Sequence, residues 1–208
     1  MYLSCMQQPH LASSLILASA SPRRRELLQQ AGLVFTIIPS NIPEEARVGE
    51  SPAEYALRVA GEKAIDVAKR YPGKWVLGAD TIVVIDEEIL GKPHDEADGY
   101  RMLRLLSSRS HQVMTAFVVV NPNGQEHACQ VVTSSVTFKS LADTQIQAYL
   151  ATGEPFDKAG AYAVQGLGAS LIERVEGSYT NVVGLPIDEV LTVLRTAGLY
   201  HTKNIRPL

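Results

Sequence analysis

A strand, a turn and the start of a helix are predicted by the stretch Leu15-Ile16-Leu17-Ala18-Ser19-Ala20-Ser21-Pro22-Arg23-Arg24-Arg25-Glu26-Leu27-Leu28. Ser21 suits the N-cap position and Pro22 the first helical position. Three arginines (23–25) then fill the first helical turn, where the positive end of the helix dipole makes each cation unfavourable by on the order of 0.3–1 kcal/mol. A bound anion would remove this conflict, because backbone N–H groups, serine hydroxyls and guanidinium groups could converge on it.

A second helix start in the same chain offers a comparison. Ser51-Pro52-Ala53-Glu54 has the same Ser-Pro beginning but places a glutamate at the third position, which is an ordinary capping box. The first helix carries bases where the second carries this acid. The arginines could also be solvated surface charges, so the motif indicates an anion site only together with other features.

The composition limits the class of protein. The 208 residues suit one sizeable domain or two small lobes around a cleft, and 46% apolar residues can form a core. The net charge of −3 argues against a protein that coats nucleic acid and favours a local basic pocket for a small anion. Cys5 and Cys129 are too few for a disulfide framework.

The sequence has no apolar run as long as a membrane span, and residues 1–14 lack the basic and apolar segments of a signal peptide. We therefore expect a cytoplasmic protein with neither a membrane nor a nucleic acid as partner. The expected organisation is one domain over residues 15–199, preceded by a flexible extension (1–14) and followed by a flexible tail (200–208).

Segments with helical and strand periodicity alternate along the chain. Beyond the first strand, helices are predicted at 22–31, 52–70, 96–106, 144–151 and 186–196, and strands at 34–38, 75–85, 113–120 and 128–138. Residues 159–175 and 178–183 mix glycine with residues typical of strands. Asn121-Pro122-Asn123-Gly124 predicts a hairpin between two strands. Because helix-linked strands and hairpins both occur, we predict an α/β fold with a mixed twisted sheet flanked by helices.

Two charged residues stand among apolar neighbours. Asp80 lies in the middle of the predicted strand 75–85, where burial of a carboxylate is costly unless it is paired, hydrogen-bonded or metal-bound. It could be a general base, a metal ligand or the cap of a neighbouring turn. Lys63 falls near the centre of the apolar stripe of the predicted helix 52–70. Its amine either reaches water past a buried stem or enters a cleft.

Other polar residues lie where the chain turns. Lys92 is held between Gly91 and Pro93, and Lys158 precedes a run of small residues, so basic groups recur at segments that a sheet could bring together. Gln165 stands beside glycine, where its amide could meet the edge of a base or tie down a loop. Glu44 and Glu45, in a polar loop, could contribute to a metal site or be solvated.

Several familiar catalytic motifs are missing. The chain has no Walker phosphate loop, no Gly-x-Gly-x-x-Gly after a strand and no Gly-x-Ser-x-Gly elbow, and its histidines show no metal-ligand spacing. What remains is a set of basic phosphate clamps with one or more carboxylates. This set fits metal-assisted phosphoryl chemistry with water as the nucleophile.

A series of motifs, in order from about residue 15 to 199, resembles the Maf family of nucleoside triphosphate pyrophosphatases. The motifs are Leu17-Ala18-Ser19-Ala20-Ser21-Pro22-Arg23-Arg24, Gly78-Ala79-Asp80-Thr81, Gly91-Lys92-Pro93, His111-Gln112-Val113-Met114-Thr115, Asp157-Lys158-Ala159-Gly160-Ala161-Tyr162, Gln165-Gly166 and Val183-Gly184-Leu185-Pro186. The resemblance implies a fold similar to that of inosine triphosphate pyrophosphatases, with two lobes around a cleft. It also implies hydrolysis of a nucleoside triphosphate to the monophosphate and pyrophosphate with Mg²⁺ or Mn²⁺.

The resemblance also implies roles for individual residues. Asp80 matches the proton acceptor. The phosphate-binding turn corresponds to Ser19, Arg23 and Arg24, and further polar positions of the substrate pocket correspond to Glu44, Lys63, Lys92 and Lys158. Our hypothesis for the mechanism is that Asp80 and Glu44 help to hold the metal.

The base pocket resembles that of one branch of the family. Arg23, Thr81 and Gln165 are similar to the set in the branch that acts on dTTP and UTP, whereas the branch that acts on 7-methyl-GTP has tryptophan, glutamine and glutamate there. Asn181 differs from some members of the pyrimidine branch. Family members often pair, which leaves a homodimer open. Two alternatives remain: a phosphatase that releases only the terminal phosphate, and a non-enzymatic nucleotide-binding regulator of cell division.

Overall fold

Three long segments with strand periodicity form the centre of one sheet: β3 (Trp75–Ile85), β5 (Ser110–Val120) and β6 (Glu126–Phe138). The computed structural model describes residues 14–200. Four shorter strands complete the sheet of this part of the chain: β1 (Leu15–Leu17), β2 (Thr36–Ile37), β4 (Glu88–Leu90) and β7 (Ile172–Glu176). The strand order is β2-β1-β3-β5-β6-β7, and β4 pairs with β3. β1 runs parallel to β2 and β3 and the other pairs are antiparallel, which confirms the predicted mixed sheet.

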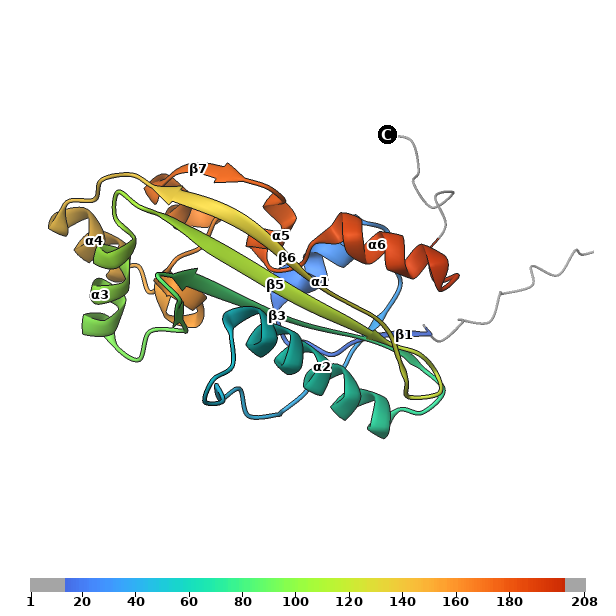
Figure 1. Cartoon of the computed structure of the whole chain (residues 1–208). Coiled ribbons are helices and arrows are strands. Elements are labelled where there is room, and N and C mark those ends of the chain that lie inside the picture. The colour runs from blue at the N-terminus through green and yellow to red at the C-terminus, as the bar shows by residue number, and fades with distance from the viewer. Residues whose placement is uncertain (1–13, 201–208) are drawn as a thin grey trace, which may run out of the picture.

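Helices cover both faces of the sheet (Figure 1). Side chains of β3 alternate between the faces, so that Val76 packs beneath α2 (Pro52–Arg70) while Leu77 packs towards α1 (Pro22–Gln30) and α6 (Ile187–Thr196). Gly78 allows α2 to lie directly on β3, since a Cβ there would be 2.3 Å from the carbonyl oxygen of Ala60.

A further core lies at the other end of the long strands, under α3 (Glu96–Leu106) and α4 (Asp143–Leu150) (Figure 1). Three short 3₁₀ segments, η1 (Glu154–Asp157), η2 (Ala159–Ala161) and η3 (Gly166–Leu171), lead from α4 to β7. The long strands thus join two lobes, as predicted.

The sheet has a gap beside β3. β5 pairs with one edge of β3 from Val76 to Val84, so β1 and β4 share the other edge. β1 pairs with Trp75–Leu77 and β4 with Val83–Ile85. Residues 78–82 of β3 therefore have no strand beside them on this edge within the described chain, and both faces of β3 are accessible from it.

The prediction of strand-like structure at 159–175 and 178–183 was largely wrong. Only β7 is a strand, and α5 (Tyr179–Val183) is a short helix whose N-cap Ser178 accepts a hydrogen bond from the backbone N–H of Asn181 (3.2 Å). Gly160 (φ 69°) and Gly166 (φ 72°) adopt the left-handed conformation, which turns the chain away from a strand. The predicted strand at 34–38 is limited to β2.

The predicted extension and tail lie outside the described residues except at their inner ends. Ser14 accepts a hydrogen bond at its carbonyl oxygen from the backbone N–H of Trp75 (2.9 Å). Tyr200 is buried in the core beside α6 and lies under the guanidinium of Arg195. These two residues therefore pack with the rest of the fold.

Candidate active site

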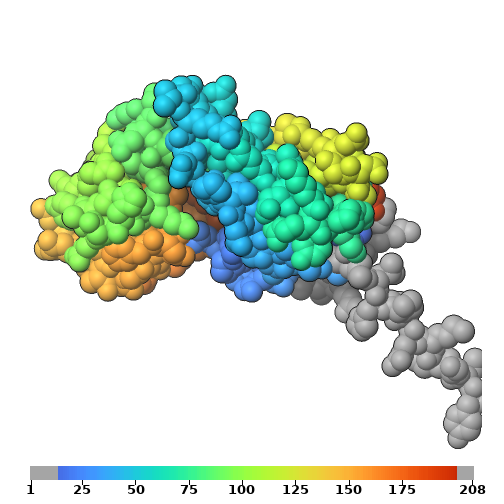
Figure 2. All heavy atoms as spheres, turned by 90° about the horizontal axis from the view of Figure 1, so that it is seen from below, coloured from blue at the N-terminus to red at the C-terminus, as the bar shows by residue number. Residues whose placement is uncertain are grey.

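A cavity of about 380 Å³ opens at the gap in the sheet, between the two lobes. Figure 2 shows the hollow between the blue part of the chain, which holds β1 and α1, and the orange part near residues 154–171. All candidate residues except Glu45 line this cavity: Ser19, Arg23, Arg24, Glu44, Lys63, Asp80, Thr81, Lys92, Lys158 and Gln165. The arginines at the first helix and the carboxylate of the central strand thus share one cavity, as the sequence predicted.

The charges in the cavity are mixed, with an excess of positive charge. Five basic side chains line it, together with three acidic ones, Glu44, Asp80 and Asp157. A strongly anionic ligand is the kind of molecule that such a cavity attracts.

Asp80, Lys63 and Glu44 form a chain of charges. Lys63 Nζ donates to Asp80 Oδ1 at 2.8 Å and lies 2.8 Å from Glu44 Oε1. Asp80 and Lys63 are both buried, whereas the Glu44 side chain is 51% exposed. The other carboxylate oxygen of Asp80, Oδ2, makes no hydrogen bond within residues 14–200 and remains for a ligand.

The local structure explains why Asp80 and Lys63 meet. Asp80 points to the α2 side of β3, two residues beyond Gly78, where α2 lies closest to the strand. Lys63 stands in the apolar stripe of α2, its side chain is buried, and its amine reaches Asp80 and Glu44 in the cavity. Of the two alternatives for Lys63, the structure confirms the amine delivered into the cleft.

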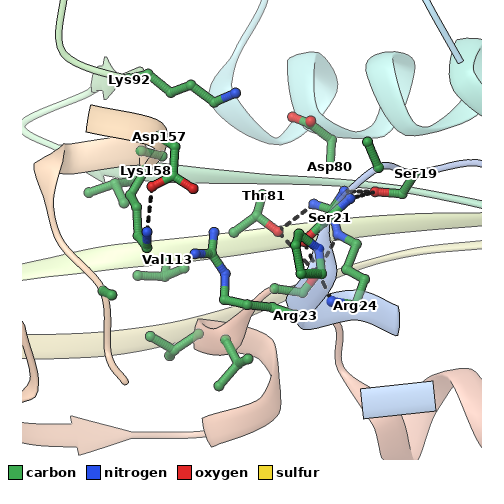
Figure 3. A pocket seen from close by; sticks show the side chains of 18 of the residues that line it. Ser19, Ser21, Arg23, Arg24, Asp80, Thr81, Lys92, Val113, Asp157 and Lys158 are labelled. Atoms are coloured by element: carbon green, nitrogen blue, oxygen red, sulfur yellow. Dashed lines mark hydrogen bonds and ion pairs between the residues drawn. The ribbon is translucent and has the colours of Figure 1, made fainter. Parts of the chain in front are cut away.

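The start of α1 forms another wall. Ser21 is the N-cap, its Oγ accepts from the backbone N–H of Arg24 (3.5 Å), and no acidic residue occupies the first turn. Arg23 lines the cavity, half-buried, and Figure 3 shows its guanidinium pointing towards Lys158. Arg25 is exposed beside Glu26 and lies outside the cavity, so only two of the three arginines face it.

Arg24 holds protein groups together. Its Nε donates to the carbonyl oxygen of Gly184 (2.8 Å), Nη1 to Ser19 Oγ (3.1 Å) and the Ala79 carbonyl (2.9 Å), and Nη2 to Thr81 Oγ1 (2.9 Å). One N–H of Nη2 is left for a phosphate. Burial lowers the pKa of Arg24, and the charges of Asp80 and Glu44 oppose this shift. Binding of phosphate oxygens by Arg24 stays a prediction. The observed role of Arg24 is to connect α1, β3 and the segment at Gly184 by hydrogen bonds.

Thr81 lies on the opposite face of β3 from Asp80. Besides Arg24, its Oγ1 contacts Thr115 Oγ1 at 2.9 Å and donates to the Gly184 carbonyl at 3.3 Å. Asn181 is fully buried behind it and donates from Nδ2 to the Val113 carbonyl (3.0 Å). Thr81 and Asn181 therefore stabilise this side of the cavity by hydrogen bonds to other protein groups.

The lobe opposite α1 contributes Lys92 and Lys158. Lys92 is exposed on the segment after β4, which the hydrogen bond from Gly160 N to the Gly91 carbonyl (3.0 Å) fixes in place. Lys158 Nζ donates to the carbonyl oxygen of Glu154 (3.1 Å) and pairs with Asp157. Figure 3 shows Lys92 reaching towards the side of Asp80, with Lys158 below it and facing Arg23.

Three polar lining residues received no role in the sequence analysis: Ser40, Asp157 and Tyr162. Asp157 and Tyr162 begin and end one of the motifs that resemble the family, which was the available signal. Ser40 has no such signal. Glu45 does not line it; its carbonyl oxygen accepts from Arg58 Nη2 (2.9 Å), so a metal role for Glu45 is not supported.

The donor set decides which metals suit the site. Within the described residues no three histidine, cysteine, aspartate or glutamate side chains gather in a way that could hold an ion. Asp80 and Glu44, bridged by Lys63, offer two carboxylates. One or two carboxylates with substrate phosphates and waters are the usual ligands of Mg²⁺, so the residues fit a cation that binds with a nucleotide.

Comparisons with known proteins agree on one family. The sequence model of the family described as Maf-like protein matches residues 14–197. A dTTP/UTP pyrophosphatase of Geobacter metallireducens is 53% identical over 186 residues, which are 89% of this chain and 97% of that protein. The dTTP/UTP pyrophosphatase of Koribacter versatilis is 47% identical over 194 residues, 93% of this chain and all of that protein.

Among solved structures, a nucleoside-triphosphatase described as a dITP/XTP pyrophosphatase, from Mycobacterium abscessus, aligns with 89% of this chain and 95% of its own. The TM-score is 0.42 and the identity 16%, and at that distance neither a shared reaction nor a shared site follows. No helix among residues 14–200 has the length and apolar character to cross a bilayer.

Proposed function

The chain belongs to the Maf family, and we propose that it is a nucleoside triphosphate pyrophosphatase that hydrolyses dTTP and UTP to the monophosphate and pyrophosphate. The relatives that share about half of its residues carry this activity in their names. One observation carries the proposal for this chain: a buried carboxylate, Asp80, lies in the same cavity as Arg23, Lys92 and Lys158.

The basic side chains suit the phosphates. In the N-terminal turn of α1, Pro22 has no N–H and those of Arg24 and Arg25 are bonded to Ser21, so Arg23 supplies the backbone N–H that remains for a phosphate. The side chains of Arg23 and Lys158 line the cavity from opposite lobes. Lys92 stands nearer to Asp80 (Figure 3). Negative charge grows on the leaving pyrophosphate as the bond from the α-phosphorus to the bridging oxygen breaks, and these cations stabilise that charge.

Asp80 suits the role of general base. Lys63 holds Oδ1, so Oδ2 can accept a hydrogen bond from a water that attacks the α-phosphorus in line with the leaving group. The proton of that water then passes to the carboxylate. General-base assistance of this kind contributes about 10²–10⁴ to the rate.

The remaining polar groups suit the base. Gln165 is exposed at the rim of the cavity, and its amide makes no hydrogen bond within the described part of the chain, so a donor and an acceptor are available for the edge of uracil or thymine. Arg23 and Thr81 bound the same space. The preference between dTTP, UTP and modified pyrimidines is a matter for assay.

A divalent cation, Mg²⁺ or Mn²⁺, belongs to the proposal. Asp80 and Glu44 would hold it together with phosphate oxygens, and when bound it would supply charge compensation for the triphosphate. We further propose a cytoplasmic enzyme whose partner is the small-molecule triphosphate rather than a nucleic acid or a membrane, and a homodimer is compatible with it. The comparisons offer no support for a non-enzymatic regulator of cell division.

The test is a triphosphate panel with Mg²⁺ or Mn²⁺, scored for pyrophosphate and for phosphate separately. We expect pyrophosphate with UMP or dTMP; phosphate with a diphosphate would show the rival phosphatase, and binding without turnover would show a sensor. Asp80→Asn should lower kcat by about 10²–10⁴. The control Asp188→Asn changes an exposed aspartate on α6 and should leave kcat unchanged. Unchanged turnover in Asp80→Asn would remove Asp80 from the chemistry.

A further inference from the structure

The loop that carries Gln165 is fixed by one carboxylate. Glu154 Oε2 accepts from the backbone N–H of Leu167 (3.0 Å), and Oε1 accepts from that of Gly168 (2.9 Å). Hydrogen bonds to a charged acceptor are about twice as strong as neutral ones. These bonds lower the pKa of Glu154 although burial acts in the opposite direction. The two residues immediately after Gln165-Gly166 are therefore held to η1.

The same carboxylate also holds the chain before Gln165. Glu154 Oε1 accepts from Tyr149 Oη (2.8 Å), and Tyr149 Oη in turn accepts from the backbone N–H of Ala163 (3.2 Å). Tyr149 is buried at the end of α4. Gln165 thus lies in a short loop whose two sides are hydrogen-bonded to the same pair of residues, Tyr149 and Glu154, which precede it by 13 or 14 positions at each bond.

The backbone packs closely against these polar atoms at two glycines. A Cβ on Gly166 would lie 2.7 Å from Glu154 Oε2, and one on Gly168 would lie 2.6 Å from Tyr149 Oη. Both glycines allow the backbone to approach these polar atoms, which matches the need for close hydrogen bonds.

The backbone of Glu154 also contacts a basic residue of the proposed phosphate region. Its carbonyl oxygen accepts from Lys158 Nζ (3.1 Å), and Lys158 lines the cavity. Glu154 itself does not line the cavity. One residue thus connects a lysine of the proposed phosphate region to the loop of the proposed base region.

We propose that Glu154 is a positioning residue that sets base selection by holding Gln165 against the edge of the pyrimidine. This inference rests on the proposed function. Uracil offers an N–H donor and a carbonyl acceptor where cytosine offers an acceptor and an amino donor, so a fixed amide favours one pattern over the other. A Gln165 amide that is free to rotate can match the edge of uracil or that of cytosine.

The experiment compares UTP with CTP in kcat and KM. In Glu154→Gln the single amide oxygen can accept from only one of the backbone N–H groups of Leu167 and Gly168, and the amide NH₂ faces the other, so the loop is loosened. We expect the preference for UTP over CTP to fall by about 3- to 10-fold, the value of one hydrogen bond. The change should come mainly from KM for UTP with kcat retained, because Asp80 and Lys63 are untouched; general unfolding would lower kcat for both nucleotides alike.

A double-mutant cycle separates a positioning role from a structural one. If Glu154 acts through Gln165, Glu154→Gln should have no further effect on the UTP to CTP preference in a Gln165→Ala background. Equal effects of Glu154→Gln with and without Gln165 would overturn the inference. Glu173→Gln, an exposed glutamate on β7, is the matched control and should change nothing.

Two further measurements keep the outcomes distinct. If Glu154→Gln does not fold, Tyr149→Phe replaces it, since it removes one donor to Glu154 and the acceptor for Ala163 and should lower the same preference less. The wild-type chain is assayed first: no pyrophosphate from UTP would refute the proposed function, whereas normal wild-type turnover with an unchanged preference in both variants would refute only the role of Glu154.

Discussion

Replacing Lys63 by methionine tests the charge chain at the centre of the site. The stem of the side chain stays similar while the ammonium that contacts Asp80 and Glu44 is lost. Asp80 is 5% exposed and would then be a buried carboxylate without its partner. Glu44, at 51% exposure, stays solvated.

The contacts of Lys63 with Asp80 and with Glu44 contribute different free energies. At 2.8 Å and an effective dielectric constant of about 20, the attraction between Lys63 and Asp80 is about 6 kcal/mol before desolvation is counted. Breaking a buried pair by removing one partner costs about 3–5 kcal/mol. The half-exposed contact with Glu44 adds about 0–1 kcal/mol. We therefore expect Lys63→Met to lower the free energy of unfolding by about 3–5 kcal/mol.

The assay is urea unfolding at pH 7 without divalent cations, followed by circular dichroism. Adding Asp80→Asn to Lys63→Met should restore most of the loss, because no uncompensated charge remains buried. Lys69→Met, an exposed lysine in the last turn of α2, should change stability by no more than about 0.5 kcal/mol. A loss below about 1 kcal/mol in Lys63→Met, or a double variant as unstable as the single one, would refute the electrostatic argument.

Three other expectations follow from the packing and the charges. Burial lowers the pKa of His111 from 6.5 to about 4, so the stabilisation from its neutral form is complete above pH 6.5 and is lost as the pH falls towards 4. The contribution of His111 to this loss is about 3 kcal/mol. Unfolding curves at both pH values should show this contribution in the wild type and not in His111→Gln. Gly78→Ala should push α2 away from β3, because the new Cβ would lie 2.3 Å from the Ala60 carbonyl oxygen. We expect thermal or urea unfolding to show a free energy of unfolding about 1–3 kcal/mol lower, and an unchanged value would show that α2 shifts without cost. Arg24→Lys should lower the free energy of unfolding by about 2–3 kcal/mol, since one ammonium cannot reach both the Gly184 carbonyl and the β3 acceptors; a stability equal to the wild type would show that these bonds are dispensable.

The site residues that the sequence identified have local signals. Asp80 and Lys63 stand out because a charge at an apolar position of a strand or helix is visible from periodicity alone. The turn at Ser21 is visible from capping rules, and the structure confirms it. Lys92 and Lys158 depended on neighbouring proline, glycine and small residues, and on resemblance to a family.

The parts that sequence reasoning missed depend on distant partners. The contacts of Arg24 within the protein were missed, because its acceptors Ala79 and Gly184 lie 55 and 160 positions away and no pattern near Arg24 indicates them. The anchoring role of Glu154 is equally hidden. Residues 159–171 form no strand despite their strand-like composition, because left-handed glycines and tertiary hydrogen bonds overrode it.

The topology explains how neighbouring residues of one strand serve different parts of the site. Asp80 and Thr81 point to opposite faces of β3, where Lys63 and Arg24 meet them respectively. A continuous sheet would separate these faces, but the edge of β3 between the pairings with β1 and β4 is open, so one cavity reaches both. Shifting β3 by one residue would exchange the two faces and place the carboxylate beside Arg24. The proposed chemistry therefore depends on the register of β3 as much as on the identity of Asp80, and a one-residue insertion at Ala79 should abolish turnover more completely than Asp80→Asn.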